Sequence, residues 1–157
     1  MTQFAIHPDA EAVCAAMADR VVETAVAAID EGGIFRIALS GGGTPKTVYP
    51  KILEPGRRDQ VDWSRVEFFW GDERTVPPDD PESNFGVAYR MLIAHLPGVR
   101  PDRVHRMQAE APDLDLAALS YESAPMGDVM SIFTDSKVTR IVAVPSAATL
   151  VTFSCCT

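Results

Sequence analysis

The sequence predicts an α/β fold with a doubly wound, mainly parallel sheet of the Rossmann-like kind. Amphipathic helical stretches alternate with short runs of β-forming apolar residues, which is the order expected of β-α-β units. Two polar loops directly follow two of these runs, as loops do at the carboxyl ends of parallel strands. After about residue 124 the alternation stops, so we expect the fold to be truncated in its C-terminal half.

The first predicted element is a helix over residues 10–31. Apolar residues recur every four positions from Val13 to Ala25, which makes a stripe along one side of a helix. A glycine pair directly after residue 31 predicts the end of this helix. The run Ile34–Leu39 then predicts the first strand, because most of its residues favour extended backbone.

Two further helices and a second strand follow. Pro45 suits the first position of a helix over Lys46–Leu53, with Thr44 as its N-cap. Val66–Trp70 is a dense run of β-forming residues and predicts the second strand. Asn84–Leu96 predicts the third helix from its apolar side.

The remaining predicted elements are short. Val104–Met107 predicts a strand, and Asp115–Glu122 predicts the start of a helix. Beyond these, three fragmentary runs predict strands without helices between them: Val129–Phe133, Arg140–Val144 and Thr149–Phe153. We therefore predict an α/β domain over residues 1–123 and an atypical tail over residues 124–157.

Composition and charge limit the function classes. The 157 residues are enough for one domain with a hydrophobic core, and the net charge of −8 argues against nucleic acid or an anionic membrane as partner. No signal-peptide pattern opens the chain, and its most apolar stretch, Ile141–Val151, is too short to span a bilayer. The three cysteines fit neither a disulfide framework nor a metal site, so we expect reduced thiols and a cytoplasmic protein.

The sharpest functional signal is the loop after the first predicted strand. Three consecutive glycines, Gly41, Gly42 and Gly43, let successive backbone N–H groups approach an anion, and the next helix presents its positive end there. Ser40 and Thr44 add hydroxyl groups. The alternative is a tight turn in which Thr44 only caps the helix, but three glycines exceed what a turn needs. The sequence has neither the Gly-Lys pair of a P-loop nor a full dinucleotide fingerprint.

Asp72, Glu73 and Arg74 directly follow the second predicted strand. Carboxylates beside an arginine at a strand end can position a cation, a hydroxyl or a phosphate. The alternative is a solvated charged turn with internal ion pairs. Because parallel strands end at one edge of a sheet, this loop and the glycine loop are expected side by side, which favours a binding role.

Four blocks of the sequence closely resemble the 6-phosphogluconolactonase family, which shares a superfamily with glucosamine-6-phosphate isomerases (deaminases). The blocks are Leu39–Pro45, Val61–Trp63, Phe69–Arg74 and Glu82–Gly86. They occur in order and at the family's spacing, and the resemblance runs from near residue 1 to about Tyr121. Four blocks together are far more specific to the family than any one block alone.

The resemblance implies a cytoplasmic hydrolase of the pentose phosphate pathway. It would open 6-phospho-D-glucono-1,5-lactone to 6-phosphogluconate without a metal or organic cofactor. The resemblance also implies that the loop Ser40–Thr44 and Arg74 hold the phosphate of a phosphorylated sugar lactone, while Asp72 lines the sugar end. The deaminase branch carries a Leu-Asp-Glu-Tyr-like string at the second loop, so Trp70–Arg74 resembles the lactonase branch.

Members of the family also carry a Gly-x-Asp-Gly-His-Thr-Ala-Ser-like motif, whose histidine is the expected general base for water. No such string occurs here, because Gly127-Asp128 is followed by Val129. The histidines His7, His95 and His105 lie outside that motif, so we assign the base to none of them and expect structural or surface roles.

Three functions follow from these residues. The first is a 6-phosphogluconolactonase-type hydrolase, and the alternative is a non-catalytic sugar-phosphate-binding module that keeps the phosphate cradle without the base. The third is an enzyme like the glucosamine-6-phosphate isomerases and deaminases. We further hypothesise that residues after about Tyr121 are not family sequence and come from a frameshift, a mispredicted gene end or a deletion.

Overall fold

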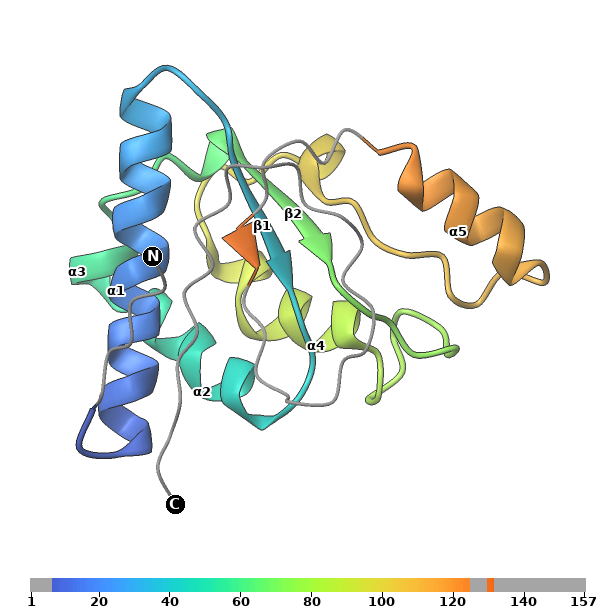
Figure 1. Ribbon diagram of the computed structural model, residues 1–157, viewed down its shortest axis with the longest axis horizontal. Helices are drawn as coiled ribbons and strands as arrows, with labels where there is room; N and C mark the ends of the chain where they lie inside the picture. Colours follow the sequence, from blue (N-terminus) through green and yellow to red (C-terminus); the bar gives the residue numbers. More distant parts are fainter. Residues whose placement is uncertain (1–6, 125–129, 132–157) are drawn as a thin grey trace, which may run out of the picture.

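The computed structural model describes residues 7–124 and 130–131 (Figure 1). Helices and strands alternate along the chain, with short 3₁₀ helices between some of them. In chain order the elements are α1 (Ala10–Asp30), β1 (Phe35–Leu39), α2 (Gly43–Ile52), α3 (Pro55–Arg58), η1 (Trp63–Arg65), β2 (Val66–Trp70), α4 (Asn84–Met91), η2 (Ile93–His95), η3 (Pro101–Arg103), α5 (Leu114–Glu122) and β3 (Met130–Ser131).

Within the described residues, the strands form a parallel sheet in the order β2-β1-β3. Leu39 pairs with Trp70 at the carboxyl ends of β1 and β2, and Ile37 pairs with Met130 of β3. The arrowheads of β1 and β2 therefore point to the same edge of the sheet in Figure 1. The predicted α/β fold with a mainly parallel sheet is confirmed.

The strand residues that belong to the hydrophobic core lie on one face of the sheet. Phe35, Ile37 and Leu39 alternate along β1 onto this face, and each is at most 3% exposed. They pack in one buried cluster with residues of α1, α2 and α4, including the whole apolar stripe predicted for α1. This packing holds the ends of β1 and β2, where the two polar loops begin.

The ends of α1 follow from local chemistry. Asp9 caps the helix, because its Oδ1 accepts a hydrogen bond of 2.8 Å from the backbone N–H of Ala12. Gly32, at φ +83°, adopts the left-handed conformation that commonly ends helices. The helix predicted over residues 10–31 is confirmed to within one residue.

Two predicted helix boundaries are wrong. The second helix begins at Gly43 with Gly42 as its N-cap, so Thr44 lies in the first turn and is not the cap. The third helix ends at Met91, because Leu92 leaves helical geometry at φ −133°, and a 3₁₀ helix follows.

The predicted strand Val104–Met107 is also wrong, since only Val104 forms a bridge, to Phe68. The N–H of His105 donates to the carbonyl of Phe68 at 2.8 Å, and the pairing stops there. The next backbone groups on that edge of β2, the N–H and carbonyl of Trp70, are hydrogen-bonded to α5. The Tyr121 hydroxyl accepts from Trp70 N at 2.7 Å and donates to Trp70 O at 2.9 Å. A side chain therefore replaces the strand that the sequence pattern predicted.

Part of the predicted tail can be located. β3 falls within the strand predicted over Val129–Phe133 and joins the parallel sheet beside β1. The strands predicted over Arg140–Val144 and Thr149–Phe153, and Gly127-Asp128, lie outside the described residues. Among the described residues, no helix is long and apolar enough to cross a membrane.

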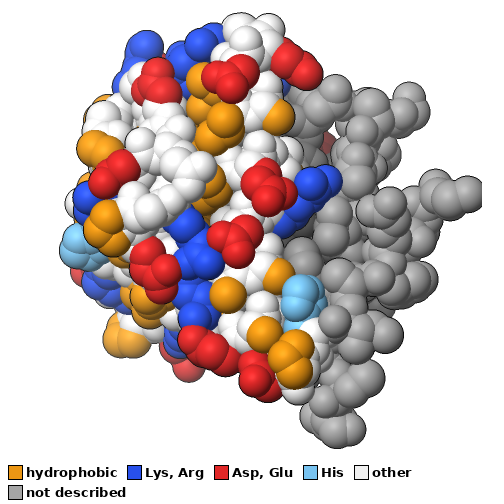
Figure 2. All heavy atoms as spheres, turned by 90° about the vertical axis from the view of Figure 1, so that its left-hand side faces the viewer, with side chains coloured by type: hydrophobic (Ala, Val, Ile, Leu, Met, Phe, Trp, Pro, Cys, Tyr) orange, Lys and Arg blue, Asp and Glu red, His pale blue; other side chains and the backbone are white. Residues whose placement is uncertain are grey.

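The face that carries α1 and α3 is a mixed charged surface. Figure 2 shows acidic and basic side chains interspersed over it. Lys51 pairs with Glu11, and Arg57 pairs with Asp19 at 2.6 Å, which ties α2 and α3 to α1. Such partly solvated pairs contribute little to stability, and none of the predicted site residues is among them.

Candidate functional site

The two polar loops begin side by side at the carboxyl edge of the sheet. Leu39 and Trp70 end their strands in register, and the N–H of Gly71 donates to the carbonyl of Leu39 at 3.0 Å. The predicted residues Ser40 and Asp72 therefore follow two neighbouring strand ends. In parallel α/β sheets this edge is where ligands bind.

The N-terminus of α2 lies in the glycine loop and has no side-chain cap. Gly42 precedes the helix at φ 102° and ψ −176°, a conformation that only glycine adopts easily. By contrast, α1, α4 and α5 are each capped by a side-chain oxygen, from Asp9, Ser83 and Asp113. The first N–H groups of α2, with the positive end of its dipole, thus receive no oxygen from a side chain of the cap.

The three glycines of the loop differ in what surrounds them. A Cβ on Gly41 would lie 1.9 Å from Oδ1 of Asn84, so the side chain of Asn84 takes that space. A Cβ on Gly43 would meet none of the described residues within 4 Å. Among the described residues, the loop thus leaves open space at Gly43, whereas Gly41 is needed for contact with α4.

Tyr49 holds the start of the glycine loop from within the core. Its hydroxyl donates to the carbonyl of Ser40 at 3.1 Å, and the side chain is only 1% exposed. Burial raises the pKa of Tyr49 well above its ordinary value, so the hydroxyl stays protonated and remains a donor.

In the second loop, one charged side chain bonds to α4 and the other two are exposed to solvent. The carboxylate of Glu73 turns toward α4 and accepts from the N–H groups of Asn84 at 2.7 Å and Phe85 at 2.9 Å. Asp72 and Arg74 are exposed, and within the described ranges no ion pair involves Arg74. Glu73 therefore stabilises the start of α4 through its N–H groups and dipole, and Asp72 and Arg74 stay available to a ligand.

Two buried polar residues at the start of α4 were not predicted as site residues. Ser83 is fully buried and caps the helix, with Oγ accepting from Gly86 N at 3.0 Å. Asn84 is 6% exposed and donates from Nδ2 to Oδ2 of Asp72 at 3.1 Å. Both lie in the Glu82–Gly86 block that carried part of the family resemblance, and a serine before a helical pattern is itself a capping signal.

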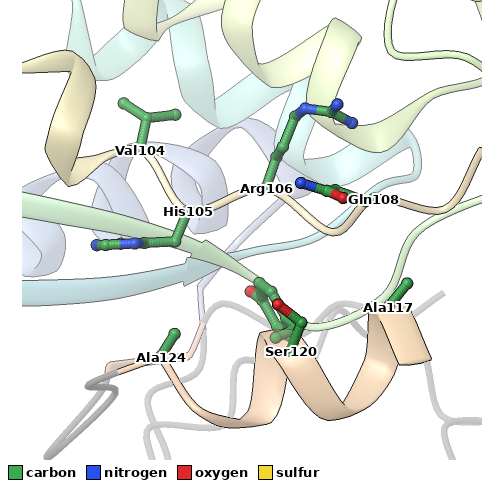
Figure 3. A pocket seen from close by; sticks show the side chains of 8 residues that line it. Val104, His105, Arg106, Gln108, Ala117, Ser120 and Ala124 are labelled. Carbon is green, nitrogen blue, oxygen red and sulfur yellow. The ribbon is translucent and has the colours of Figure 1, made fainter. Parts of the chain in front are cut away.

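A separate cavity of about 270 Å³ lies between residues 104–108 and α5 (Figure 3). His105 lines it and stacks on Phe69 with ring centroids 4.5 Å apart. Arg106 points away from α5 in Figure 3 and pairs with Glu110 at 2.7 Å. Within the described chain, Nε2 of His105 is buried and has no hydrogen-bond partner. None of the predicted site residues lines this cavity.

Known proteins resemble this chain in both sequence and structure. The 6-phosphogluconolactonase of Mycobacterium tuberculosis is 39% identical over 132 residues, covering 78% of this chain and 52% of that protein. The solved structure of a devB protein superposes with a TM-score of 0.68 at 32% identity, covering 77% of this chain and 48% of the other. The 6-phosphogluconolactonase of Trypanosoma brucei gives a TM-score of 0.60 at 26% identity, with 77% and 47% covered.

The chain spans about half the length, or less, of these and other relatives, for example 37% for the 6-phosphogluconolactonase of Haemophilus influenzae. A profile of glucosamine-6-phosphate isomerases/6-phosphogluconolactonase matches residues 8–136. This match continues past Tyr121 and includes β3, so the hypothesis that the residues after about Tyr121 are not family sequence is wrong as far as residue 136. The chain therefore belongs to the glucosamine-6-phosphate isomerase/6-phosphogluconolactonase family.

Proposed function

We propose that this chain binds a phosphorylated sugar lactone at the carboxyl edge of β1 and β2 and acts as a 6-phosphogluconolactonase. The reaction would open 6-phospho-D-glucono-1,5-lactone to 6-phosphogluconate. The observation that carries the proposal is the uncapped N-terminus of α2 in the glycine loop, which lies beside a second loop with an exposed arginine. The family to which the chain belongs includes enzymes with this name.

The proposed phosphate site combines backbone and side-chain donors. The N–H groups at Gly43 and Thr44 begin α2 and are favoured by its dipole for binding a dianion. Arg74 would add a charge-assisted contact from the second loop, and the hydroxyl of Ser40 lies at the start of the first. In this site, burial by the ligand strengthens each contact, because water no longer screens it.

The sugar end of the ligand would lie toward Asp72. Its carboxylate is already oriented by the amide of Asn84, so it can accept hydrogen bonds from sugar hydroxyls without first losing conformational freedom. Opening the lactone requires water to add to C1, and the C1–O bond of the ring then breaks as the ring oxygen takes a proton. In this proposal Asp72 and Arg74 bind and orient the lactone, and the phosphate provides binding energy remote from C1.

A second candidate function is a sugar-phosphate-binding module without catalysis. The observation that favours it is the absence of a Gly-His pair anywhere in the sequence, although the family's motif contains one. A deaminase-like activity is disfavoured by the Gly71–Arg74 string, and we expect no ammonia release from glucosamine 6-phosphate. In each of the first two cases the partner is a phosphorylated sugar acid or lactone, in a cytoplasmic protein.

The test is the rate of 6-phosphogluconolactone hydrolysis by purified protein, compared with the spontaneous rate in buffer. A cooperative unfolding transition must first show that the protein is folded. We expect acceleration that is lost in Arg74→Ala and retained in Arg20→Ala, because Arg20 is an exposed arginine on α1. A folded protein that binds 6-phosphogluconate without acceleration would instead support the binding module.

The role of Arg74 is tested separately by calorimetry with the product. We expect Arg74→Ala to weaken binding of 6-phosphogluconate by about 1.5–3 kcal/mol, as for a charge-assisted hydrogen bond. Binding of gluconate, which lacks the phosphate, should change much less. Equal losses for the two ligands would remove Arg74 from the phosphate site, and Arg20→Ala again serves as the control.

A further inference from the structure

Asn84 is the buried side chain that contacts both loops of the candidate site. It is 6% exposed at the first position of α4. On one side its Nδ2 donates to the backbone carbonyl of Asp72 at 3.2 Å and to Oδ2 of the same residue at 3.1 Å. These two bonds fix both the backbone and the side chain of Asp72.

On its other side, the amide of Asn84 lies against the glycine loop. An ideal Cβ built on Gly41 would be 1.9 Å from Oδ1 and 2.6 Å from Cγ of Asn84. No real Cβ could be accommodated at such distances, so the amide and the backbone of Gly41 are in direct contact. The amide of Asn84 thus contacts both Gly41 and Asp72, which lie in loops that follow different strands.

The position of Asn84 is itself fixed by neighbouring bonds. Its N–H donates to Oε1 of Glu73 at 2.7 Å, and the preceding residue Ser83 caps α4. Since α4 packs in the core, the amide is carried by a rigid element and not by a free loop.

We propose that Asn84 is a positioning residue that sets the spacing between the glycine loop and Asp72, and thereby selects ligands by length. This inference rests on the proposed function for its ligand. If the N–H groups at the start of α2 bind the phosphate, a fixed amide between the loops holds Asp72 at one distance from that phosphate. A sugar acid whose polar end lies at that distance from its phosphate binds well, and a shorter one cannot reach both groups.

The first experiment is a double-mutant cycle on stability and needs no ligand. Thermal unfolding is measured for wild type, Gly41→Ala, Asn84→Ala and the double variant. In the wild-type background we expect Gly41→Ala to lower the melting temperature by about 4 °C or more, because the new methyl group collides with the amide. In the Asn84→Ala background the same change should cost about half of that or less. Additive shifts would overturn the contact and the proposal with it.

The second experiment measures ligand selection by calorimetry, with 6-phosphogluconate and with 4-phosphoerythronate, a phosphorylated sugar acid two carbons shorter. We expect wild type to prefer the longer acid. Asn84→Ala should weaken 6-phosphogluconate by about tenfold and the shorter acid by less, so that the preference shrinks. The matched control is Asp113→Ala, which removes the side-chain cap of a different helix, α5, and should lower stability with the preference unchanged.

The outcomes separate this proposal from the proposed function. An unchanged preference in a folded Asn84→Ala protein would overturn the selective role of Asn84 while leaving the phosphate site intact. The same loss of preference in Asp113→Ala would also overturn it, because any loss of stability would then suffice. If wild type binds neither acid, the proposed function fails, and the double-mutant cycle alone decides whether Asn84 fixes the two loops.

Discussion

Gly41, Gly42 and Gly43 stand in one run, yet each meets a different physical requirement. Gly41 leaves room for the amide of Asn84, and Gly42 adopts a positive φ of 102° before α2. Gly43 opens α2 with free space where a side chain would point. The structure of the loop explains the first two glycines, and the proposed phosphate site would explain the third.

This difference predicts different outcomes for alanine at neighbouring positions. Gly42→Ala should lower the free energy of unfolding by about 1–2 kcal/mol, because an alanine at positive φ is strained. Gly43→Ala should leave it within about 0.5 kcal/mol of wild type, since its methyl group enters open space. Urea unfolding measures both values.

In a binding experiment, the variant with normal stability, Gly43→Ala, should be the one that is impaired. If the space at Gly43 holds the phosphate, Gly43→Ala should weaken 6-phosphogluconate despite its normal stability. Unchanged affinity in a folded Gly43→Ala protein would place the phosphate elsewhere. Gly56→Ala is the matched control, because a Cβ there also meets none of the described residues within 4 Å and Gly56 lies on α3.

Among the elements, α5 is joined to the sheet, within the part of the chain that the structure describes, by hydrogen bonds from one side chain. The hydroxyl of Tyr121 bonds both the N–H and the carbonyl of Trp70, which otherwise lie on the edge of β2. The leucines of α5 contribute little, since Leu114, Leu116 and Leu119 are 47%, 65% and 63% exposed. A polar contact, more than burial of apolar surface, therefore places this helix beside β2.

Tyr121→Phe should lower the free energy of unfolding at neutral pH by about 1–3 kcal/mol, because it leaves two backbone groups of Trp70 without this partner. Burial raises the pKa of Tyr121 from 10.0 to about 12, with a smaller opposing effect from its bond to Trp70. The neutral hydroxyl is thus favoured in the folded state, and its stabilisation is complete below pH 10 and lost as pH rises toward 12.

The pH dependence gives this prediction a second measurement. Stability of wild type should fall between pH 10 and about 12, and the fall should be shallower in Tyr121→Phe. The remaining fall belongs in part to Tyr49, whose pKa burial also raises. Tyr89→Phe, at an exposed tyrosine, should match wild type in stability at neutral pH. Wild-type stability of Tyr121→Phe at neutral pH would contradict the anchoring role.

At the scale of the whole molecule, the apolar side chains on α5 form an uncovered surface. Leu116 and Leu119 are each more than 60% exposed, on a chain that spans about half the length of its relatives. Exposed apolar surface of this kind promotes association, although the net charge of −8 opposes it at low ionic strength.

We expect the protein to self-associate through α5 as concentration and salt are raised. Sedimentation velocity should show a weight-average coefficient that rises with concentration for wild type. The double variant Leu116→Gln, Leu119→Gln should sediment as a monomer, because the apolar surface is removed at exposed positions that carry no packing. Tyr89→Gln is the control for an exposed apolar residue elsewhere, and identical behaviour of the two variants would exclude α5 as the contact.

Periodicity and local chemistry in the sequence were enough to predict α1, β1, β2 and the start of α4, each close to its observed bounds. They also placed the glycine loop and the Asp72–Arg74 loop at neighbouring strand ends, because parallel strands in register must end together. Those features depend on residues close in sequence, or on a general property of parallel sheets. The predicted site residues follow from this local information, and their role in binding stays a prediction.

Tertiary structure alone decided how the loops are held. Glu73 was one of three charged residues in a row, and only its contacts with α4 distinguish it from Asp72 and Arg74. The amide of Asn84 against Gly41, like the Tyr121 hydroxyl on β2, joins residues from separate elements. Local propensity carries no information about which distant group will fill a space or satisfy a strand edge, because that depends on how all the elements pack together.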